Sequence, residues 1–418
     1  MGDWLGRQLE IDVTNVAHGG IAVGRHEGRV VFVSDAIPGE RVLARVSDDS
    51  KAKFWRADTV TVIEPSEHRR EHVWAAASVD RDPDDRAGGA EFGHIELGHQ
   101  RELKRRVLTD ALQRMAGIDS EVTVDAVPGA AEDGTGWRTR LRLHVADDGT
   151  VGPFAARSHR VIRVDDVPLA TPEAAAITPL DESFPGSSHV DVVVPSVGNP
   201  FVLAGTTGDR GGARPKPKRQ KITERVGERE FTLDVRGFWQ VHRGAAQALT
   251  TAVQEAVDPA LFDPRAANHD LYGGVGLLAA AVGDRFGAST RITTVEADSL
   301  ATDHAAKNLA EWLGASAITA RVDRYLADLV KSRQGLAGAT VVLDPPRSGA
   351  GRAVVDALAT LAPAQLVYVA CDPVALARDV AMLKGHGFEL TRLRAFDLFP
   401  HTHHLEAVAT LVRTDAAG

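Results

Sequence analysis

The chain has 418 residues, of which 44% are hydrophobic and 25% are charged, and its formal net charge is −9. This length predicts two or three domains, the composition excludes a largely disordered chain, and the negative charge excludes a uniformly basic nucleic-acid binder. No apolar run is long enough for a membrane helix and the N-terminus lacks a signal-peptide pattern, so we expect a cytoplasmic protein that makes no membrane contact.

Residues 1–65 are predicted to form a small β-barrel. Strand-like runs at 9–13, 29–33, 41–46 and 57–62 alternate with turns that contain glycine or proline. Small barrels of this kind often present strands and loops to nucleic acid, and this one carries basic side chains that suit RNA. A barrel that only stabilises the fold, with its charges facing solvent, fits the pattern equally well.

Residues 66–237 are predicted to form a mixed α/β middle domain. The stretch 75–93 is rich in Ala, Asp and Gly without periodicity, which predicts a surface loop with no obvious chemistry. Apolar residues recur at helical spacing over 99–116, and residues 138–145 alternate as a half-buried strand does. The basic, proline-broken segment 214–221 is either an arm that grips RNA phosphates or a merely solvated loop.

Residues 238–418 change to strands that alternate with helices. This alternation predicts a Rossmann-like domain with a mostly parallel sheet, which binds its ligands at the carboxyl ends of the strands. The expected strands are 291–295, 340–343 and 365–370, and the expected helices include 301–313 and 374–383.

A glycine-rich turn opens this domain. The segment Asp270-Leu271-Tyr272-Gly273-Gly274-Val275-Gly276 closes a strand and opens an apolar helical run, and Glu296 ends the next strand. Glycines allow the backbone to approach a ligand, and an acidic side chain at that position accepts hydrogen bonds from ribose hydroxyls. The turn therefore predicts a nucleoside-containing cofactor. An NAD site or a turn without a ligand has the same pattern.

Two further segments follow strands at the same edge of the predicted sheet. Asp344-Pro345-Pro346-Arg347 is stiffened by its prolines, which lets it hold the Asp344 carboxylate in a fixed direction. Cys371 is the single cysteine of the chain, which excludes an internal disulfide and an all-cysteine metal cluster. A lone cysteine is more often a small buried apolar residue than a nucleophile, but the strand end in front of it favours the nucleophile.

The segment from Phe399 to Glu406 places a carboxylate immediately before the closing apolar strand. It also contains three histidines, at 401, 403 and 404. Acidic or thiol partners at metal-ligand spacing are absent nearby, so we interpret these histidines as turn packing and predict no metal site.

Four separated segments of the chain together resemble the RNA 5-methyluridine (uracil-5-) methyltransferases, and the N-terminal barrel resembles their TRAM domain. These segments are Phe238-Trp239-Gln240-Val241, the glycine turn, Asp344 to Arg347, and Cys371 with Phe399 to Glu406. The resemblance implies that S-adenosylmethionine is bound by Gln240, Tyr272, Glu296 and Asp344, with Asp323 near the adenine. It also implies that Cys371 is the nucleophile, that Glu406 is the proton acceptor, and that helix 99–116 packs on the catalytic domain.

The chain departs from the family pattern at several places. Some relatives carry a four-cysteine iron–sulfur cluster where this chain has residues 74–93, which contain no cysteine, so we predict no cluster and a loop held by ordinary packing. Leu277 replaces an asparagine that touches the cofactor in several relatives, which predicts one lost contact. Asp372 beside Cys371 is expected to disfavour the thiolate.

The predicted function is methylation of carbon 5 of a uridine, with ribosomal RNA as the first choice of substrate and transfer RNA as the second. We expect a monomer. Two other classes remain open from the sequence. An NAD-dependent oxidoreductase explains the glycine turn but leaves Cys371 and Glu406 without a role, and a non-catalytic RNA-binding protein explains only the barrel and the basic arm.

Overall fold

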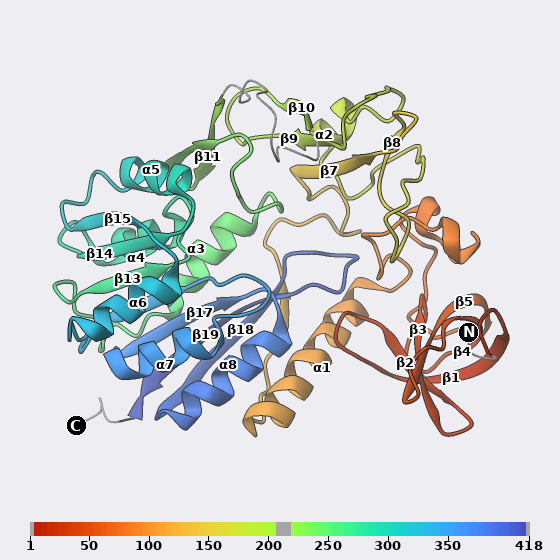
Figure 1. The fold of residues 1–418 in the computed structure, drawn as a ribbon, viewed down its shortest axis with the longest axis horizontal. Helices are drawn as coiled ribbons and strands as arrows, with labels where there is room; N and C mark the ends of the chain where they lie inside the picture. The colour runs from red at the N-terminus through yellow and green to blue at the C-terminus, as the bar shows by residue number, and fades with distance from the viewer. Residues whose placement is uncertain (1–3, 206–218, 415–418) are drawn as a thin grey trace.

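The computed structural model describes residues 4–205 and 219–414, which form three lobes (Figure 1). The N-terminal lobe is a barrel, the middle lobe is built on a small antiparallel sheet, and the C-terminal lobe is a large sheet flanked by helices. Residues 214–218 of the predicted basic arm lie outside the described residues. No helix in the described ranges is both long and apolar enough to cross a membrane.

The N-terminal lobe is a closed barrel in which strands pair in the order β1-β2-β3-β5-β4. Every second side chain of β1 points into the barrel up to Val13, where a bulge shifts the pairing with β2, so the alternation in the sequence directly produces a filled interior. The barrel has one strand more than the four expected runs, because the short polar strand β2 carries little apolar signal. The strands are β1 (Gln8–Val16), β2 (Ala22–His26), β3 (Arg29–Ser34), β4 (Arg41–Asp48) and β5 (Phe54–Glu64).

The stretch 75–93 differs from the expected surface loop, because much of it is buried. Two 3-10 turns, Ala75–Ala77 and Pro83–Asp85, fold it against the middle lobe. Four of its alanines, Ala76, Ala77, Ala87 and Ala90, pack into one apolar cluster with Trp74 and Trp137, among other residues. The stretch has no hydrophobic periodicity, so the sequence pattern did not reveal this burial. The packing of these alanines holds the stretch in place.

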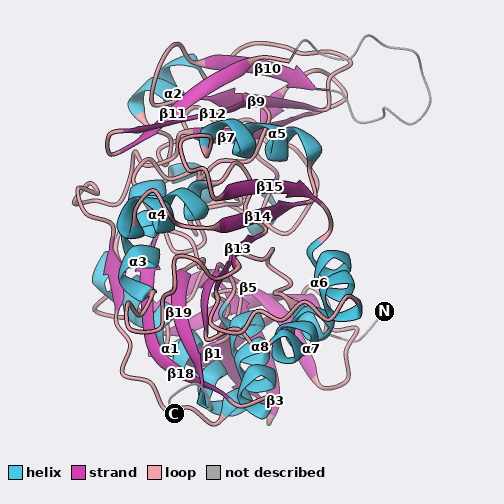
Figure 2. Ribbon diagram, turned by 90° about the vertical axis from the view of Figure 1, so that its left-hand side faces the viewer, coloured by secondary structure: helices cyan, strands magenta, loops and turns pink. Residues whose placement is uncertain are grey.

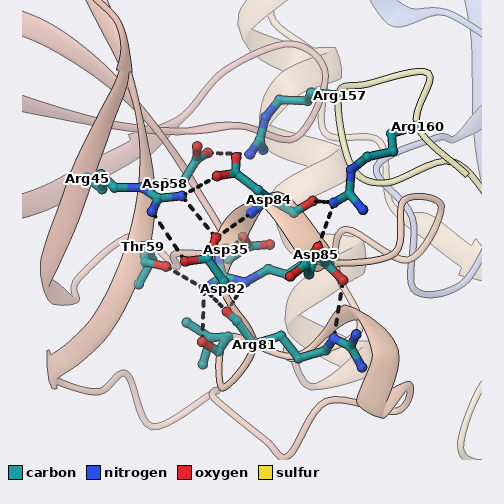
Figure 3. A network of polar contacts seen from close by, with 12 residues as sticks. Asp35, Arg45, Asp58, Thr59, Arg81, Asp82, Asp84, Asp85, Arg157 and Arg160 are labelled. Atoms are coloured by element: carbon teal, nitrogen blue, oxygen red, sulfur yellow. Dashed lines mark hydrogen bonds and ion pairs between the residues drawn. The ribbon is translucent and has the colours of Figure 1, made fainter. Parts of the chain in front are cut away.

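Arg86 ties this buried stretch to the barrel. Two of its partners, Asp35 and Thr59, are labelled in the network of polar contacts that Figure 3 shows. The Arg86 side chain is only 2% exposed, and its guanidinium donates to the Asp35 carboxylate at 2.7 Å and to the Thr59 carbonyl at 2.8 Å. Further donations reach the carbonyls of Val79 and Arg81. A buried guanidinium with this many partners is satisfied in one arrangement only, so it fixes the barrel against the middle lobe.

The rest of the middle lobe is a four-stranded sheet, order β10-β9-β7-β8, followed by the hairpin β11-β12. The hairpin leaves the middle lobe and packs against α5 of the C-terminal lobe. The elements are β7 (Arg140–Val145), β8 (Val151–Gly152), α2 (Pro172–Ile177), β9 (His189–Val193), β10 (Phe201–Gly205), β11 (Lys221–Val226) and β12 (Arg229–Asp234).

The C-terminal lobe is an eight-stranded sheet with the order β15-β14-β13-β16-β17-β19-β18-β6. Helices α3 and α4 cover one face and α6, α7 and α8 cover the other (Figure 2). The strands are β6 (Val124–Ala126), β13 (Asn268–Leu271), β14 (Ile292–Glu296), β15 (Ala315–Thr319), β16 (Thr340–Leu343), β17 (Gln365–Ala370), β18 (Phe388–Asp397) and β19 (Glu406–Arg413). The helices are α3 (Ala245–Ala256), α4 (Leu277–Phe286), α5 (Ser299–Asn308), α6 (Val322–Lys331), α7 (Gly351–Leu361) and α8 (Pro373–Gly385).

Helix α5 ends at Asn308, five residues before the end expected at Leu313. The chain leaves the helix so that Trp312 can pack on α4. A Cβ atom at Gly283 would lie 2.6 Å from the Trp312 ring, so the glycine in α4 makes room for this indole. Tertiary packing therefore overrides the helical spacing of the sequence at this point.

Helix α1 (Leu97–Ala116) precedes most of the middle lobe in the sequence but packs along α8 of the C-terminal lobe (Figure 1). Its Lys104 is fully buried and donates to the Asp397 carboxylate at 2.5 Å and to the Phe399 carbonyl at 3.1 Å. Asp397 ends β18, so this ion pair anchors the helix to the start of the segment that leads to Glu406.

We predict that Lys104→Met lowers the free energy of unfolding by about 3–5 kcal/mol, because it leaves the Asp397 carboxylate buried without its partner. The control is Arg114→Ala on the same helix, whose side chain is 74% exposed in its pair with Asp110 and whose loss costs less than about 1 kcal/mol. Urea unfolding followed by circular dichroism measures both. Equal effects of the two substitutions would contradict a structural role for the buried pair.

Candidate active site at the carboxyl edge of the sheet

The reversed strand β19 brings Cys371 and Glu406 together. Strand β17 ends at Ala370, which pairs with Ala407 of β19 in an antiparallel ladder. The next position in this register sets Cys371 opposite Glu406, the first residue of β19. Residues opposite each other in such a ladder have Cα atoms about 4.5–5.5 Å apart. The sheet itself therefore places a thiol beside a carboxyl group.

The remaining predicted residues lie on the neighbouring strands of the same edge. Leu271 at the end of β13 pairs with Val295 of β14, which sets Tyr272 beside Glu296. Asp344 follows β16, the strand between β13 and β17. Five adjacent strands thus contribute Glu296, Tyr272, Asp344, Cys371 and Glu406 in that order.

The glycine turn after β13 is shaped by close contacts. The amide of Gly274 donates to the Glu296 carboxylate at 3.1 Å, and a Cβ atom at Gly273 would lie 2.4 Å from a methyl group of Thr294. Tyr272 and Gly276 both have positive φ, at 62° and 90°. Glycine is favoured in this backbone region, and a tyrosine held there is strained. The turn is therefore built to present its backbone and the tyrosine ring to a ligand.

These residues surround a cavity of about 830 Å³. Gln240, Tyr272, Glu296, Asp344, Cys371 and Glu406 all line it. Asp323 does not line it: this carboxylate pairs with Arg321 at 2.9 Å, although it lies near enough to Tyr272 to raise the pKa of that phenol. Leu277 packs into the hydrophobic core behind the glycine turn.

Burial raises the pKa values of the thiol and of two carboxyl groups of the cavity. Burial raises the pKa of Cys371 to about 12, and the nearby carboxylates of Glu406 and Asp344 raise it further. Burial likewise raises the pKa of Asp344 to about 7 and that of Glu406 well above its usual value. Arg347 opposes these shifts at Cys371 and Glu406. The site is thus an acidic cluster with the Arg347 guanidinium beside it.

Asp372 has structural partners at the start of α8 and in the barrel. Its carboxylate accepts hydrogen bonds from the amides of Val374 and Ala375 at the start of α8, and it contacts the His18 ring of the barrel at 2.7 Å. These partners hold its charge, and the pKa of the Cys371 thiol is raised by burial, Glu406 and Asp344. Asp372 is a helix cap and an inter-lobe contact.

The three histidines of the segment before Glu406 hold the loop in place. His401 is buried between Gln100 and the Asp133 carbonyl, His403 lies 3.6 Å from Glu91, and His404 contacts Arg347 at 3.2 Å. Burial lowers the pKa of His404 to about 3, so its neutral ring accepts a hydrogen bond from the guanidinium. Within residues 4–205 and 219–414 no group of His, Cys, Asp and Glu side chains could hold a metal ion.

Several residues of the cavity wall were not assigned from the sequence. Arg138, Arg347, Phe238 and His404 line the cavity. Arg347 follows the Asp344-Pro345-Pro346 turn, and Phe238 precedes Gln240, so the motifs contained them without indicating a role. Arg138 belongs to a strand-like run in the middle domain and carried no signal that pointed to this site.

The residues present fit S-adenosylmethionine. The Glu296 carboxylate lies at the end of the second strand, where it can accept both ribose hydroxyls. One oxygen of the buried Asp270 carboxyl, directly before the glycine turn, has no hydrogen-bond partner in the described structure, and burial raises the pKa of this group to about 8. A cationic sulfonium is the kind of ligand that such an acidic cavity favours.

Comparison with known proteins supports the same chemistry. The family model described as tRNA (Uracil-5-)-methyltransferase matches residues 296–414, and the TRAM domain model matches residues 5–60. An uncharacterised RNA methyltransferase of Streptomyces avermitilis is 35% identical, over 97% of this chain and 98% of the relative. The 23S rRNA (uracil(1939)-C(5))-methyltransferase of Pseudomonas aeruginosa is 29% identical, over 97% and 94%.

Among solved structures, the tRNA (uracil-54, C5)-methyltransferase of Pyrococcus abyssi in complex with S-adenosyl-L-homocysteine matches with a TM-score of 0.69. The match covers 97% of this chain and 100% of that chain at 20% sequence identity, so it establishes the shared fold. The family model and the Streptomyces avermitilis relative, together with the cavity, identify an S-adenosylmethionine-dependent methyltransferase. The chain belongs to the RNA (uracil-5-)methyltransferase family and carries its TRAM domain.

We predict that Cys371 becomes reactive when a cation is bound beside it. Alkylation by iodoacetamide at pH 8 is expected to be slow in the free protein, because the pKa of the thiol is about 12. S-Adenosylmethionine should accelerate it at least about tenfold, the change that one unit of pKa gives. S-Adenosylhomocysteine, which fills the same space without the positive charge, is the control. Equal rates with the two ligands would refute this electrostatic activation.

A second prediction concerns pH. The pKa of Asp344 is raised from 3.8 to about 7, so the folded protein binds a proton that the unfolded chain has released. The contribution of Asp344 to the free energy of unfolding therefore falls as pH rises through this window. In Asp344→Asn, the free energy of unfolding should fall less steeply between pH 5 and 7 than in the wild type. Urea unfolding midpoints across this pH range measure the difference. An unchanged slope would show that the carboxyl group is not buried as described.

Proposed function

We propose that this protein transfers a methyl group from S-adenosylmethionine to carbon 5 of a uridine in ribosomal RNA. The observation that carries the proposal is the position of Cys371 opposite Glu406 at the edge of the sheet, beside the cofactor cavity. A thiol and a carboxyl group at adjacent strand ends are the pair that this reaction needs.

The reaction requires a nucleophile because carbon 5 of uracil is only weakly nucleophilic. The Cys371 thiolate adds to carbon 6 of the ring, and the electron pair displaced from the double bond forms an enolate whose carbon 5 can accept a methyl group. S-Adenosylmethionine supplies that methyl group, and its sulfur would keep the electron pair of the broken S–CH3 bond, which leaves S-adenosylhomocysteine. Arg347 acts in favour of the thiolate, because it opposes part of the rise in the pKa of Cys371 that burial and the neighbouring carboxylates cause.

Glu406 completes the reaction. Once carbon 5 carries both a hydrogen and a methyl group, the Glu406 carboxylate removes the hydrogen as a proton. The electron pair restores the double bond between carbons 5 and 6 and expels the Cys371 thiolate. The base must leave any stack to reach both residues, so the target is a flipped or looped nucleotide.

Ribosomal RNA is favoured over transfer RNA by the relatives. The Pseudomonas aeruginosa relative named for 23S rRNA matches at 29% identity, and the Pyrococcus abyssi structure named for tRNA matches at 20%. The closed barrel and the large middle lobe offer surface for a folded RNA loop. Transfer RNA is the second candidate substrate.

We further propose that the protein acts in the cytoplasm as a monomer. One chain supplies all the residues that line the cavity, so no second copy is needed to complete the site. Its single cysteine lies in that site and suits a reducing compartment. Sedimentation velocity of the purified protein, with and without RNA, tests the oligomeric state.

The decisive experiment is covalent trapping. Wild-type protein and Cys371→Ser are incubated with S-adenosylmethionine and either ribosomal or transfer RNA that contains 5-fluorouridine. Fluorine at carbon 5 cannot leave as a proton, so the wild type should form a complex that survives denaturation, and the serine variant should not. The RNA that traps more protein identifies the substrate class. A total absence of adduct on both RNAs would reject uridine methylation.

Glu406→Gln provides a matched test on ordinary RNA. Without the base, the methylated intermediate keeps its bond to Cys371, so this variant should accumulate a covalent complex even without fluorine. Asp372→Asn, which alters a cap rather than a reacting group, serves as the control and should accumulate none. Free methylated RNA at the wild-type rate from the Glu406 variant would assign the proton transfer to another group.

A further inference from the structure

A second cavity lies in the middle lobe, next to the active site. Its volume is about 320 Å³, which falls within the range of sites for small ligands, roughly 300–1,000 Å³. Strand β7 forms one side, with Leu141 and Leu143 in the wall. The rings of His144 and Phe154 are stacked in the wall with centroids 3.4 Å apart. A flat ring pair in an apolar pocket offers a platform for another flat ring.

Cationic side chains surround this apolar pocket. Arg138, Arg142 and Arg157 all line it. Arg142 is paired with Asp191 and Arg157 with Asp58, whereas Arg138 contacts no carboxylate among the described residues. The hydrogen bond of Arg138 runs from its Nε to the Arg140 carbonyl at 3.1 Å. Its two terminal nitrogens therefore have donors left for an external acceptor.

The two cavities share part of their walls. Arg138 and Gly89 line both the middle-lobe pocket and the cavity that contains Cys371 and Glu406. An RNA strand that places one nucleotide in the catalytic cavity can therefore continue past Arg138 into the middle-lobe pocket. Gly89 has a φ of 101° and no side chain to obstruct that path.

We propose that the middle-lobe pocket binds a nucleotide that flanks the target uridine in the RNA substrate. The base of the flanking nucleotide contacts the His144–Phe154 pair. Arg138 donates hydrogen bonds to a phosphate between the flanking nucleotide and the target uridine. Base stacking on a ring platform and a guanidinium on phosphate are the contacts that single-stranded RNA uses. The proposal rests on the proposed function, which supplies the RNA, and it adds a second recognition point to that function.

The test locates the flanking base directly. The RNA segment trapped through 5-fluorouridine is resynthesised with 4-thiouridine at each flanking position in turn, trapped on the wild-type protein, and irradiated. Mass spectrometry then identifies the crosslinked residues. One flanking position should crosslink to residues 138–158. Adduct formation without any crosslink in that range would overturn the pocket while leaving the methylation chemistry intact.

Binding measurements test the pocket without requiring the reaction. His144→Ala should weaken the affinity for fluorescein-labelled decauridylate by about 5- to 100-fold, as loss of a base-stacking partner does. Phe154→Leu, which preserves apolar volume, should act in the same direction, and circular dichroism checks that both variants are folded. Arg163→Ala is the control, since this exposed residue of the same lobe pairs with Asp181 outside the pocket. Wild-type affinity in both pocket variants would overturn the proposal even if no adduct ever forms.

Discussion

The antiparallel register between β17 and β19 is the constraint on which the active site depends. In a parallel sheet, every strand offers its carboxyl end to the same edge. Strand β19 runs the other way, so its first residue, Glu406, reaches that edge and meets the last residues of β17. A one-residue slip would turn Glu406 to the opposite face of the sheet and separate it from Cys371. The hydrogen bonds between two central strands therefore determine where Glu406 lies relative to the end of β17.

The segment from Phe399 to Glu406, which leads into β19, is also held by residues much earlier in the chain. The Phe92 amide donates to the His401 carbonyl at 2.9 Å, and Gln100 accepts from the His401 amide at 2.8 Å. Lys104 holds the Phe399 carbonyl. The buried Arg86 connects the same region to the barrel. The first hundred residues therefore contribute to the geometry of a site whose reacting groups lie after residue 370.

The sequence predicted the elements whose structure follows from a local apolar pattern. It did not predict the features that depend on packing between lobes. The apolar strands β16 and β17 and the motifs at their ends were predictable, because buried parallel strands are continuous apolar runs. Strand β18 was missed because it is an edge-side strand with a largely exposed, polar middle. The burial of residues 75–93 and the contact of Asp372 with His18 depend on partners distant in sequence, so local pattern could not reveal them. The sequence shows directly that residues 75–93 contain no cysteine for an iron–sulfur cluster. It does not show that the alanines of this stretch are packed.

The charged side chains that line the cavity suit two different ligands. The carboxyl groups of Asp344 and Glu406 make part of its wall acidic, a setting that favours a bound cation. Arg138 and Arg347 line the same cavity and can attract the phosphates of RNA. A protein with a net charge of −9 can therefore bind RNA where its local charge is positive. The Cys371 thiol lines the same cavity, so a cation that donates the methyl group there also favours the thiolate that attacks the base.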